Sequence, residues 1–264
     1  MEIIESVALG AVQGITEFLP VSSSGHLQLA KEILDVNIEE NLAYDVVLHA
    51  ATVLSTIVVL WSEIWWLVRG IFTRGMNEEK SYFFKLVISM IPIGIIGAVF
   101  KDDIDAMLGS SYIMAVVGGM LLVTATLLAF AYYARPRQRE QISYRDAMII
   151  GAAQAAASMP GLSRSGSTIA TGLLLGNKKS AVATFSFLMV LAPIIGQTGL
   201  EIVKDGFTLE GISTGALVAG FVSSFIVGCL ACRFMINIVK QGKLIWFAIY
   251  CAIVGLVAMG TYIF

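Results

Sequence analysis

The stretch EFLPVSSSGHL, from Glu17 to Leu27, decides how this chain folds. It places a carboxylate, three serines and a histidine inside a segment whose flanks are apolar enough for lipid. Pro, Gly and Ser break the helix here, and unpaired backbone amides in lipid cost several kcal/mol each. We therefore predict that residues 6–30 form a re-entrant hairpin, helix, loop and helix, whose polar loop is surrounded by protein or by a water-filled cavity.

The composition around this stretch indicates a membrane protein. Of 264 residues, 57% are hydrophobic and 14% are charged, and several apolar runs exceed the ~18 residues that mark a membrane helix. No basic tract with interleaved aromatic residues is present, so membrane lipids are expected partners and nucleic acid is not. The first residues lack the basic region of a signal peptide, and we expect them to belong to the mature protein. We predict one all-α membrane domain, residues 1–264, with six transmembrane helices at 44–68, 83–100, 112–134, 181–203, 214–235 and 244–263.

A second broken stretch repeats the frame of the first. Residues 147–175 are apolar at both ends and interrupted by SMPGLSRSGST, which predicts a second re-entrant hairpin. Aligning GAVQ at residues 10–13 with GAAQ at residues 151–154 places VSSSGH on LSRSGS without a gap. The chain therefore consists of two predicted repeats, roughly 1–134 and 147–264, each a hairpin followed by three spans. The alignment pairs Ser22 with Ser163, Ser23 with Arg164, Ser24 with Ser165, and Gly25 with Gly166.

Basic residues orient the chain in the membrane. If only the six long segments cross, thirteen Lys and Arg residues fall in one set of loops and three in the other. The positive-inside rule makes the first set cytoplasmic and puts both termini outside. Three spans per half invert the second repeat, so the two hairpins enter from opposite faces and their loops should touch near the bilayer midplane. The thirteen are Arg69, Arg74, Lys80, Lys85, Arg135, Arg137, Arg139, Arg145, Lys178, Lys179, Arg233, Lys240 and Lys243; the three are Lys31, Lys101 and Lys204.

The two loops together have the chemistry of an anion site. The second helix of each hairpin begins in the loop, with Ser available as N-cap, so two helix N-termini with free N–H groups would converge. Ser- and Gly-rich loops let backbone amides approach phosphate oxygens closely. Arg164 adds a planar cation suited to phosphate. The candidate phosphate-binding residues are Ser22, Ser24, Gly25, Ser163, Ser165 and Gly166.

Titratable groups complete this predicted site. Gln13 and Glu17 are four residues apart on one helix face, and His26 stands three residues after Ser23. Ionisable groups at membrane depth are costly, so they indicate function, although Glu17 and Arg164 could instead pair across the repeats as a structural contact. Asp45 and His49 also share a helix face, which is typical of a local hydrogen-bonded pair or, less simply, of a second metal site.

These motifs resemble the bacterial undecaprenyl-diphosphate phosphatase family, the bacitracin-resistance type of membrane phosphatase. Its signatures are (E/Q)-x-x-x-E followed by P-V-S-S-[ST]-G-H, and P-G-x-S-R-S-G-[AS]-T. The first reads QGITEFLPVSSSGH from Gln13 to His26, and the second reads PGLSRSGST from Pro160 to Thr168. The similarity covers essentially the whole chain and includes DVVLHAAT from Asp45 to Thr52. By position, the resemblance implies an active site of Gln13, Glu17, Ser23, His26, Ser163 and Arg164, with Thr168 close by.

The resemblance also implies an activity. The expected reaction is hydrolysis of a C55 polyprenyl diphosphate to the monophosphate, recycling the lipid carrier of cell-wall glycans at the plasma membrane. A divalent cation, Mg²⁺ or Ca²⁺, would bridge the phosphates, and Glu17 and Gln13 are its candidate ligands, although Gln is a weaker ligand than the Glu of other members. The alternative is a transporter or flippase of anionic polyprenyl phosphates. Whether the protein forms a homodimer stays open.

The nucleophile is open between Ser23, His26 and an activated water. Ser23 faces Arg164 in the repeat frame, and His26 follows about one turn later. We therefore expect Ser23 to attack, with His26 as the general base. Glu17 would then orient His26 or help to hold the cation.

Overall fold

The structure is a computed structural model that describes residues 2–34, 36, 42–100, 106–107, 112–134, 138–205 and 212–263. Over these ranges the chain forms eleven helices and, apart from one isolated bridge, no β-structure. The prediction of an all-α protein is confirmed. The helices are α1 (Ile3–Phe18), α2 (Ser23–Ile33), α3 (Leu42–Val59), α4 (Trp61–Ile71), α5 (Glu78–Val99), α7 (Ile113–Tyr133), α8 (Tyr144–Ala156), α9 (Arg164–Leu174), α10 (Lys179–Asp205), α11 (Thr214–Gln241) and α12 (Ile245–Ile263).

Four described helices are long and apolar enough to cross a membrane: α5, α7, α11 and the Lys179–Gly196 part of α10. The pair α3 and α4 makes five if it counts as one bent span. Helix α12 is also apolar, but its Ile245–Gly260 stretch is shorter. These helices fit a multi-pass membrane protein, since each can satisfy its own backbone hydrogen bonds in lipid.

The predicted span at residues 44–68 is wrong as a single straight helix. The chain breaks at Leu60, and α3 and α4 meet at an angle of 77°. No proline or glycine lies at the break, but the sequence changes character there. Trp61, Trp65 and Trp66 are exposed on α4, and Arg69 stacks on Trp65, 4.8 Å from the ring centroid. Tryptophan and arginine side chains favour the interface between lipid and water, and such residues are typical of the end of a membrane span.

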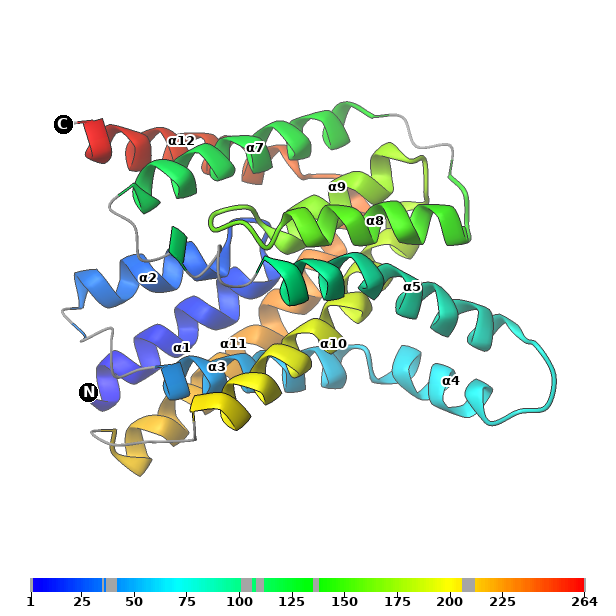
Figure 1. Ribbon diagram of the computed structural model, residues 1–264, viewed down its shortest axis with the longest axis horizontal. Coiled ribbons are helices and arrows are strands. Elements are labelled where there is room, and N and C mark those ends of the chain that lie inside the picture. The colour runs from blue at the N-terminus through cyan, green and yellow to red at the C-terminus, as the bar shows by residue number, and fades with distance from the viewer. Residues whose placement is uncertain are drawn as a thin grey trace.

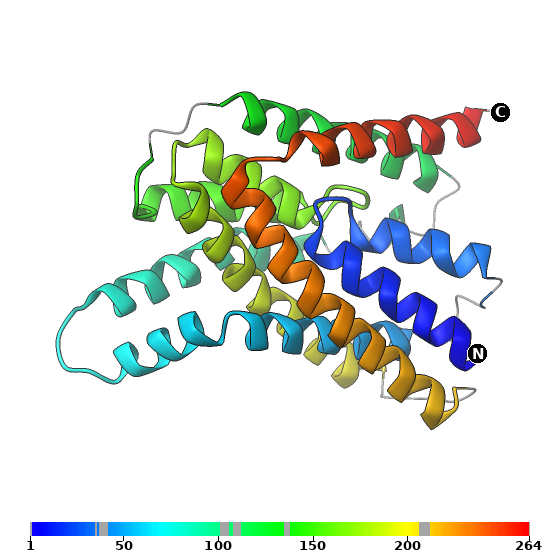
Figure 2. The same ribbon diagram turned by 180° about the vertical axis from the view of Figure 1, so that it is seen from behind.

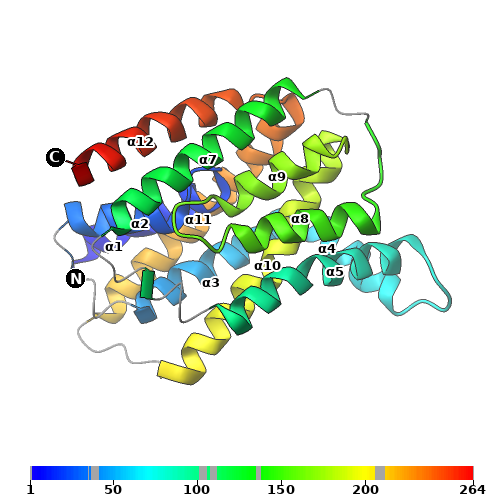
Figure 3. The ribbon, with the colours of Figure 1, turned by 45° about the horizontal axis from the view of Figure 1, so that its top comes forward.

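Each predicted hairpin is a pair of adjacent helices, α1 with α2 and α8 with α9, and each pair packs on a long helix of the other half (Figure 1). Helix α1 lies along α11, and α8 lies along α5. Both contacts need a glycine, because a Cβ at Gly10 would run into the carbonyl oxygen of Gly220, and one at Gly151 into that of Ser89. Helices α7 and α12 run side by side (Figure 3).

The two termini lie far from the turn between α4 and α5, since both termini are at one end of the molecule and this turn is at the other (Figures 1 and 2). The count of basic residues treated Lys31 as a loop residue. In the structure it lies in the last turn of α2, and its side chain is buried. Three other residues of that count, Lys101, Arg135 and Arg137, lie outside the described residues.

Candidate active site

The two polar loops meet, as the sequence predicts. The Ser165 hydroxyl at the start of α9 donates to the Leu19 carbonyl in the first loop, at 3.2 Å. Pro20 packs against Gly166, where an added Cβ would lie 3.1 Å from its side chain. The Ser163 side chain caps α9 by accepting the Gly166 N–H at 3.1 Å. Each hairpin therefore brings its second helix N-terminus to the same place.

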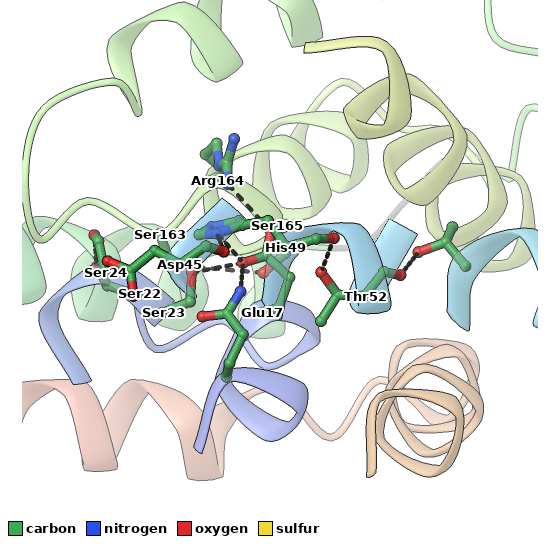
Figure 4. Close-up of polar contacts among 12 residues, drawn as sticks. Glu17, Ser22, Ser23, Ser24, Asp45, His49, Thr52, Ser163, Arg164 and Ser165 are labelled. Carbon is green, nitrogen blue, oxygen red and sulfur yellow. Dashed lines mark hydrogen bonds and ion pairs between the residues drawn. The ribbon is translucent and has the colours of Figure 1, made fainter. Parts of the chain in front are cut away.

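Glu17 is the centre of the site (Figure 4). Its Oε2 accepts a hydrogen bond from the Ser23 hydroxyl at 2.7 Å and another from the Gln13 amide at 3.0 Å. Its Oε1 accepts from Arg164 Nη2 at 3.1 Å, across the two hairpins. The Nε2 atom of His49 lies 3.9 Å from Oε2. One carboxylate thus joins residues from α1, α2, α3 and α9.

This carboxylate is buried with its counter-charge. The Glu17 side chain is 6% exposed and that of Arg164 is 22% exposed. A buried charge is tolerated when it is paired and hydrogen-bonded, and both conditions hold here. The predicted Glu17–Arg164 contact is therefore present. It holds the loops together and also keeps a cation beside the Ser23 hydroxyl.

The predicted contact between Ser23 and His26 is wrong in this structure. His26 Nδ1 donates to the Ser22 carbonyl at 2.9 Å, and Nε2 lies 2.6 Å from the Tyr250 hydroxyl of α12. Both ring nitrogens of His26 therefore have partners other than Ser23. The reason is that α2 begins at Ser23, so the side chain of His26 leans back over the carbonyl one turn before it. Glu17 consequently contacts His49 and not His26.

His49 and Asp45 do contact one another, but through the backbone. His49 Nδ1 donates to the Asp45 carbonyl oxygen at 2.8 Å. The Asp45 carboxylate instead accepts from Lys31 Nζ at 2.7 Å, which ties α2 to α3. In the part of the chain that the structure describes, no group of three or more His, Cys, Asp or Glu side chains could hold a metal ion.

The predicted phosphate-binding residues line the two loops in matching pairs. The hydroxyls of Ser22 and Ser24 lie 3.5 Å apart, and those of Ser163 and Ser165 lie 3.3 Å apart. Ser22 takes a positive φ of 70°, which is uncommon outside glycine and marks a constrained turn. Gly25 and Gly166 lie in the first turns of α2 and α9. Thr168 is one turn further, where its hydroxyl donates to the Arg164 carbonyl at 3.0 Å.

Comparison with known proteins identifies the family. The family described as "Bacitracin resistance protein BacA" matches residues 6–257. The chain belongs to the BacA family. Among its BacA-family relatives, a protein of Parabacteroides distasonis is 58% identical over 262 residues, and one of Bacteroides fragilis is 56% identical over 262 residues; each match covers 98% of both chains. A protein of Christiangramia forsetii is 45% identical over 261 residues, again covering 98% of both chains. All three relatives are named undecaprenyl-diphosphatase.

The sequence did not predict the contacts of two residues in this BacA-family site, Tyr250 and His49. Tyr250 lies far from both loops in sequence and in an apolar segment, and no local pattern marks it. His49 was singled out for its spacing from Asp45, but its approach to Glu17 was not foreseen. A signal for His49 did exist, because DVVLHAAT belongs to the stretch that resembles the family.

Proposed function

We propose that this chain hydrolyses undecaprenyl diphosphate to undecaprenyl phosphate and inorganic phosphate. The observation that carries the proposal is the cluster on Glu17. A serine hydroxyl is hydrogen-bonded to a buried carboxylate, with an arginine on the other oxygen of that carboxylate, where two helix N-termini meet. The names of the family relatives supply the substrate.

Ser23 is the nucleophile in this proposal. Its Oγ attacks the terminal phosphorus, an Oγ–P bond forms, and the bond from that phosphorus to the bridging oxygen breaks. Undecaprenyl phosphate leaves with the bridging oxygen. The Ser23 proton passes to Glu17, the acceptor of its 2.7 Å hydrogen bond. Water then hydrolyses the phosphoserine, giving inorganic phosphate and returning a proton to Ser23.

Arg164 and the loop backbones neutralise the phosphates. Of the five N–H donors of the Arg164 guanidinium, one binds Glu17 and fixes the orientation of the planar group. The other donors are then available to the phosphates. The Ser163 side chain already accepts the Gly166 N–H, and the N-terminus of α9 presents the positive end of its helix dipole to the phosphates. Positioning and charge neutralisation are what phosphoryl transfer needs most.

A divalent cation, Mg²⁺ or Ca²⁺, belongs to the proposal. The Oε1 atom of Gln13 is buried and has no hydrogen-bond partner in the described part of the chain, next to the Glu17 carboxylate. These are the oxygen ligands that such cations take, and Mg²⁺ in particular is bound through one or two carboxylates together with substrate phosphates. Gln13 and Glu17 would hold the cation, and it would neutralise charge on the diphosphate.

We further propose how the chain sits in the plasma membrane. Six spans, with α3 and α4 counted as one, and two re-entrant hairpins, α1–α2 and α8–α9, would form an inverted repeat of residues 1–134 and 147–264. Matching contacts support this arrangement, since α1 lies on α11 as α8 lies on α5. Both termini would be outside, as the thirteen-to-three distribution of basic residues indicates.

This topology predicts that the connection between α7 and α8 is cytoplasmic. A single cysteine at Gln138, in a background without Cys229, Cys232 and Cys251, should react with a membrane-impermeant maleimide only after the cells are opened. A single cysteine at Glu2, at the start of α1, should react in intact cells. Strong labelling of the Gln138 cysteine in intact cells would contradict the orientation.

Phosphate release tests the activity itself. Purified protein in detergent, given labelled C55 diphosphate and Mg²⁺, should produce the monophosphate and free phosphate. A transporter or flippase of anionic polyprenyl phosphates is the second candidate, because paired halves of this kind permit alternating access. Transport alone liberates no phosphate. Absence of release, together with movement of labelled lipid phosphate across vesicles, would replace the first candidate by the second.

A further inference from the structure

Helix α12 reaches the loop of the first hairpin at two adjacent residues. The Tyr250 hydroxyl lies 2.6 Å from His26 Nε2, and the two rings are stacked with centroids 5.7 Å apart and planes at 23°. Next to it, the buried Cys251 thiol donates to the Pro20 carbonyl at 3.2 Å. The last helix therefore holds both sides of the turn that carries Ser23.

The hydrogen bonds of His26 define its tautomer. A backbone carbonyl only accepts, so the 2.9 Å contact with the Ser22 oxygen requires the proton on Nδ1. The neutral ring then presents a lone pair at Nε2, and the Tyr250 hydroxyl donates to it. Without this hydroxyl, Nε2 would lose the partner that fixes the rotation of the ring.

Packing alone explains the contact less well. The Tyr250 side chain is 42% exposed, so the ring fills no core position whose loss would leave a cavity. Its other features, a stacked imidazole and a short hydrogen bond, are both directed at His26. The hydroxyl and the ring face of Tyr250 therefore both serve the contact with His26.

We propose that Tyr250 is a positioning residue of the phosphatase. The Ser22 carbonyl fixes the Nδ1–H tautomer of His26, and the Tyr250 hydroxyl fixes the rotation of its ring in the first turn of α2, where Ser23 also lies. The inference rests on the proposed function, because His26 lies in the first turn of α2, close to the residues Ser22, Ser24 and Gly25 that are assigned to the diphosphate. It gives α12 a part in the chemistry that acts through His26.

Tyr250→Phe tests the inference, since it removes the hydroxyl and keeps the ring. We expect kcat to fall about fivefold to tenfold, the effect of one lost hydrogen bond, with KM nearly unchanged. Tyr132→Phe on α7 is the matched control, because Tyr132 is 43% exposed and contacts another tyrosine ring. In a His26→Asn background, Tyr250→Phe should change kcat by less than about twofold. An equal loss in both backgrounds, or no loss in either, would overturn the proposal.

A second measurement does not depend on activity. The chain has two histidines, so ¹⁵N-labelled histidine gives two imidazole rings, and His26→Asn identifies one of them. We expect His26 as the Nδ1–H tautomer, with its Nε2 resonance displaced in Tyr250→Phe, while His49 serves as an internal reference. If the protein releases no phosphate, the proposed function fails, and this spectrum alone decides the inference. A His26 ring that is unaffected by Tyr250→Phe would refute it.

Discussion

Ser23→Ala should abolish a phosphorylated form of the protein and lower phosphate release roughly a thousandfold or more, the scale of losing a nucleophile. The Ser23 hydroxyl is the one that the structure joins to Glu17, at 2.7 Å. Alanine removes the attacking oxygen and leaves the Glu17–Arg164 pair in place. Activity that remains would come from water, positioned by the same cation and helix N-termini.

The measurement is rapid-quench trapping with substrate labelled in its terminal phosphate. The expected product is an acid-stable, alkali-labile phosphoprotein that is absent from Ser23→Ala. Ser62→Ala is the matched control, because the Ser62 hydroxyl also donates to a glutamate, Glu63, at 2.6 Å, but on the exposed helix α4. Ser62→Ala should keep both the label and the rate.

Either of two other results would show that Ser23 is not the nucleophile. An acid-labile label that survives Ser23→Ala but is lost in His26→Asn would make the histidine the nucleophile. That outcome would also require His26 to leave Tyr250, since its Nε2 is occupied in this structure. Fast turnover without any trapped phosphoprotein would favour direct attack by water.

The broken segments were predictable because their chemistry is local. Pro, Gly and Ser inside an apolar stretch leave backbone groups that lipid cannot satisfy, whatever the remainder of the chain does. The repeat frame then aligned Ser23 with Arg164, and the structure brings both residues to Glu17. The repeat frame thus predicted that the two loops touch, and Arg164 contacts Glu17 across 147 residues of sequence.

The partners of His26 were not predictable, because they depend on where α12 is placed. Counting residues along α2 gives the spacing between Ser23 and His26 correctly. It cannot show that the His26 ring forms a hydrogen bond with Tyr250, which is 224 residues away. Lys31 illustrates the same limit. The charge rule treats it as a loop residue, whereas Asp45 on the neighbouring α3 lets it be buried. Rules based on single residues fail where a partner from another helix compensates the charge.

Arg164→Lys should lower kcat by about tenfold or more, which corresponds to about 1.4 kcal/mol of lost transition-state stabilisation for each tenfold. Lysine keeps the charge near Glu17 but loses the planar fork. An arginine can bind Glu17 through one nitrogen, as Nη2 does here at 3.1 Å, and still present other N–H donors to phosphate. The lysine ammonium group is a compact point charge. It cannot lie at its best distance from the Glu17 carboxylate and from the substrate phosphate at the same time.

Arg139→Lys separates this effect from a general loss of stability. Arg139 also pairs with a buried carboxylate, its Nη1 lying 3.3 Å from Asp146 Oδ2, but it contacts neither polar loop. Both variants keep every charge, so a defect in folding alone would appear in both. A selective loss of kcat in Arg164→Lys, with unchanged thermal unfolding in detergent, would assign the guanidinium to the transition state. Near-normal turnover would show that positive charge suffices at this position, and that the fork serves only to join the two hairpins through Glu17.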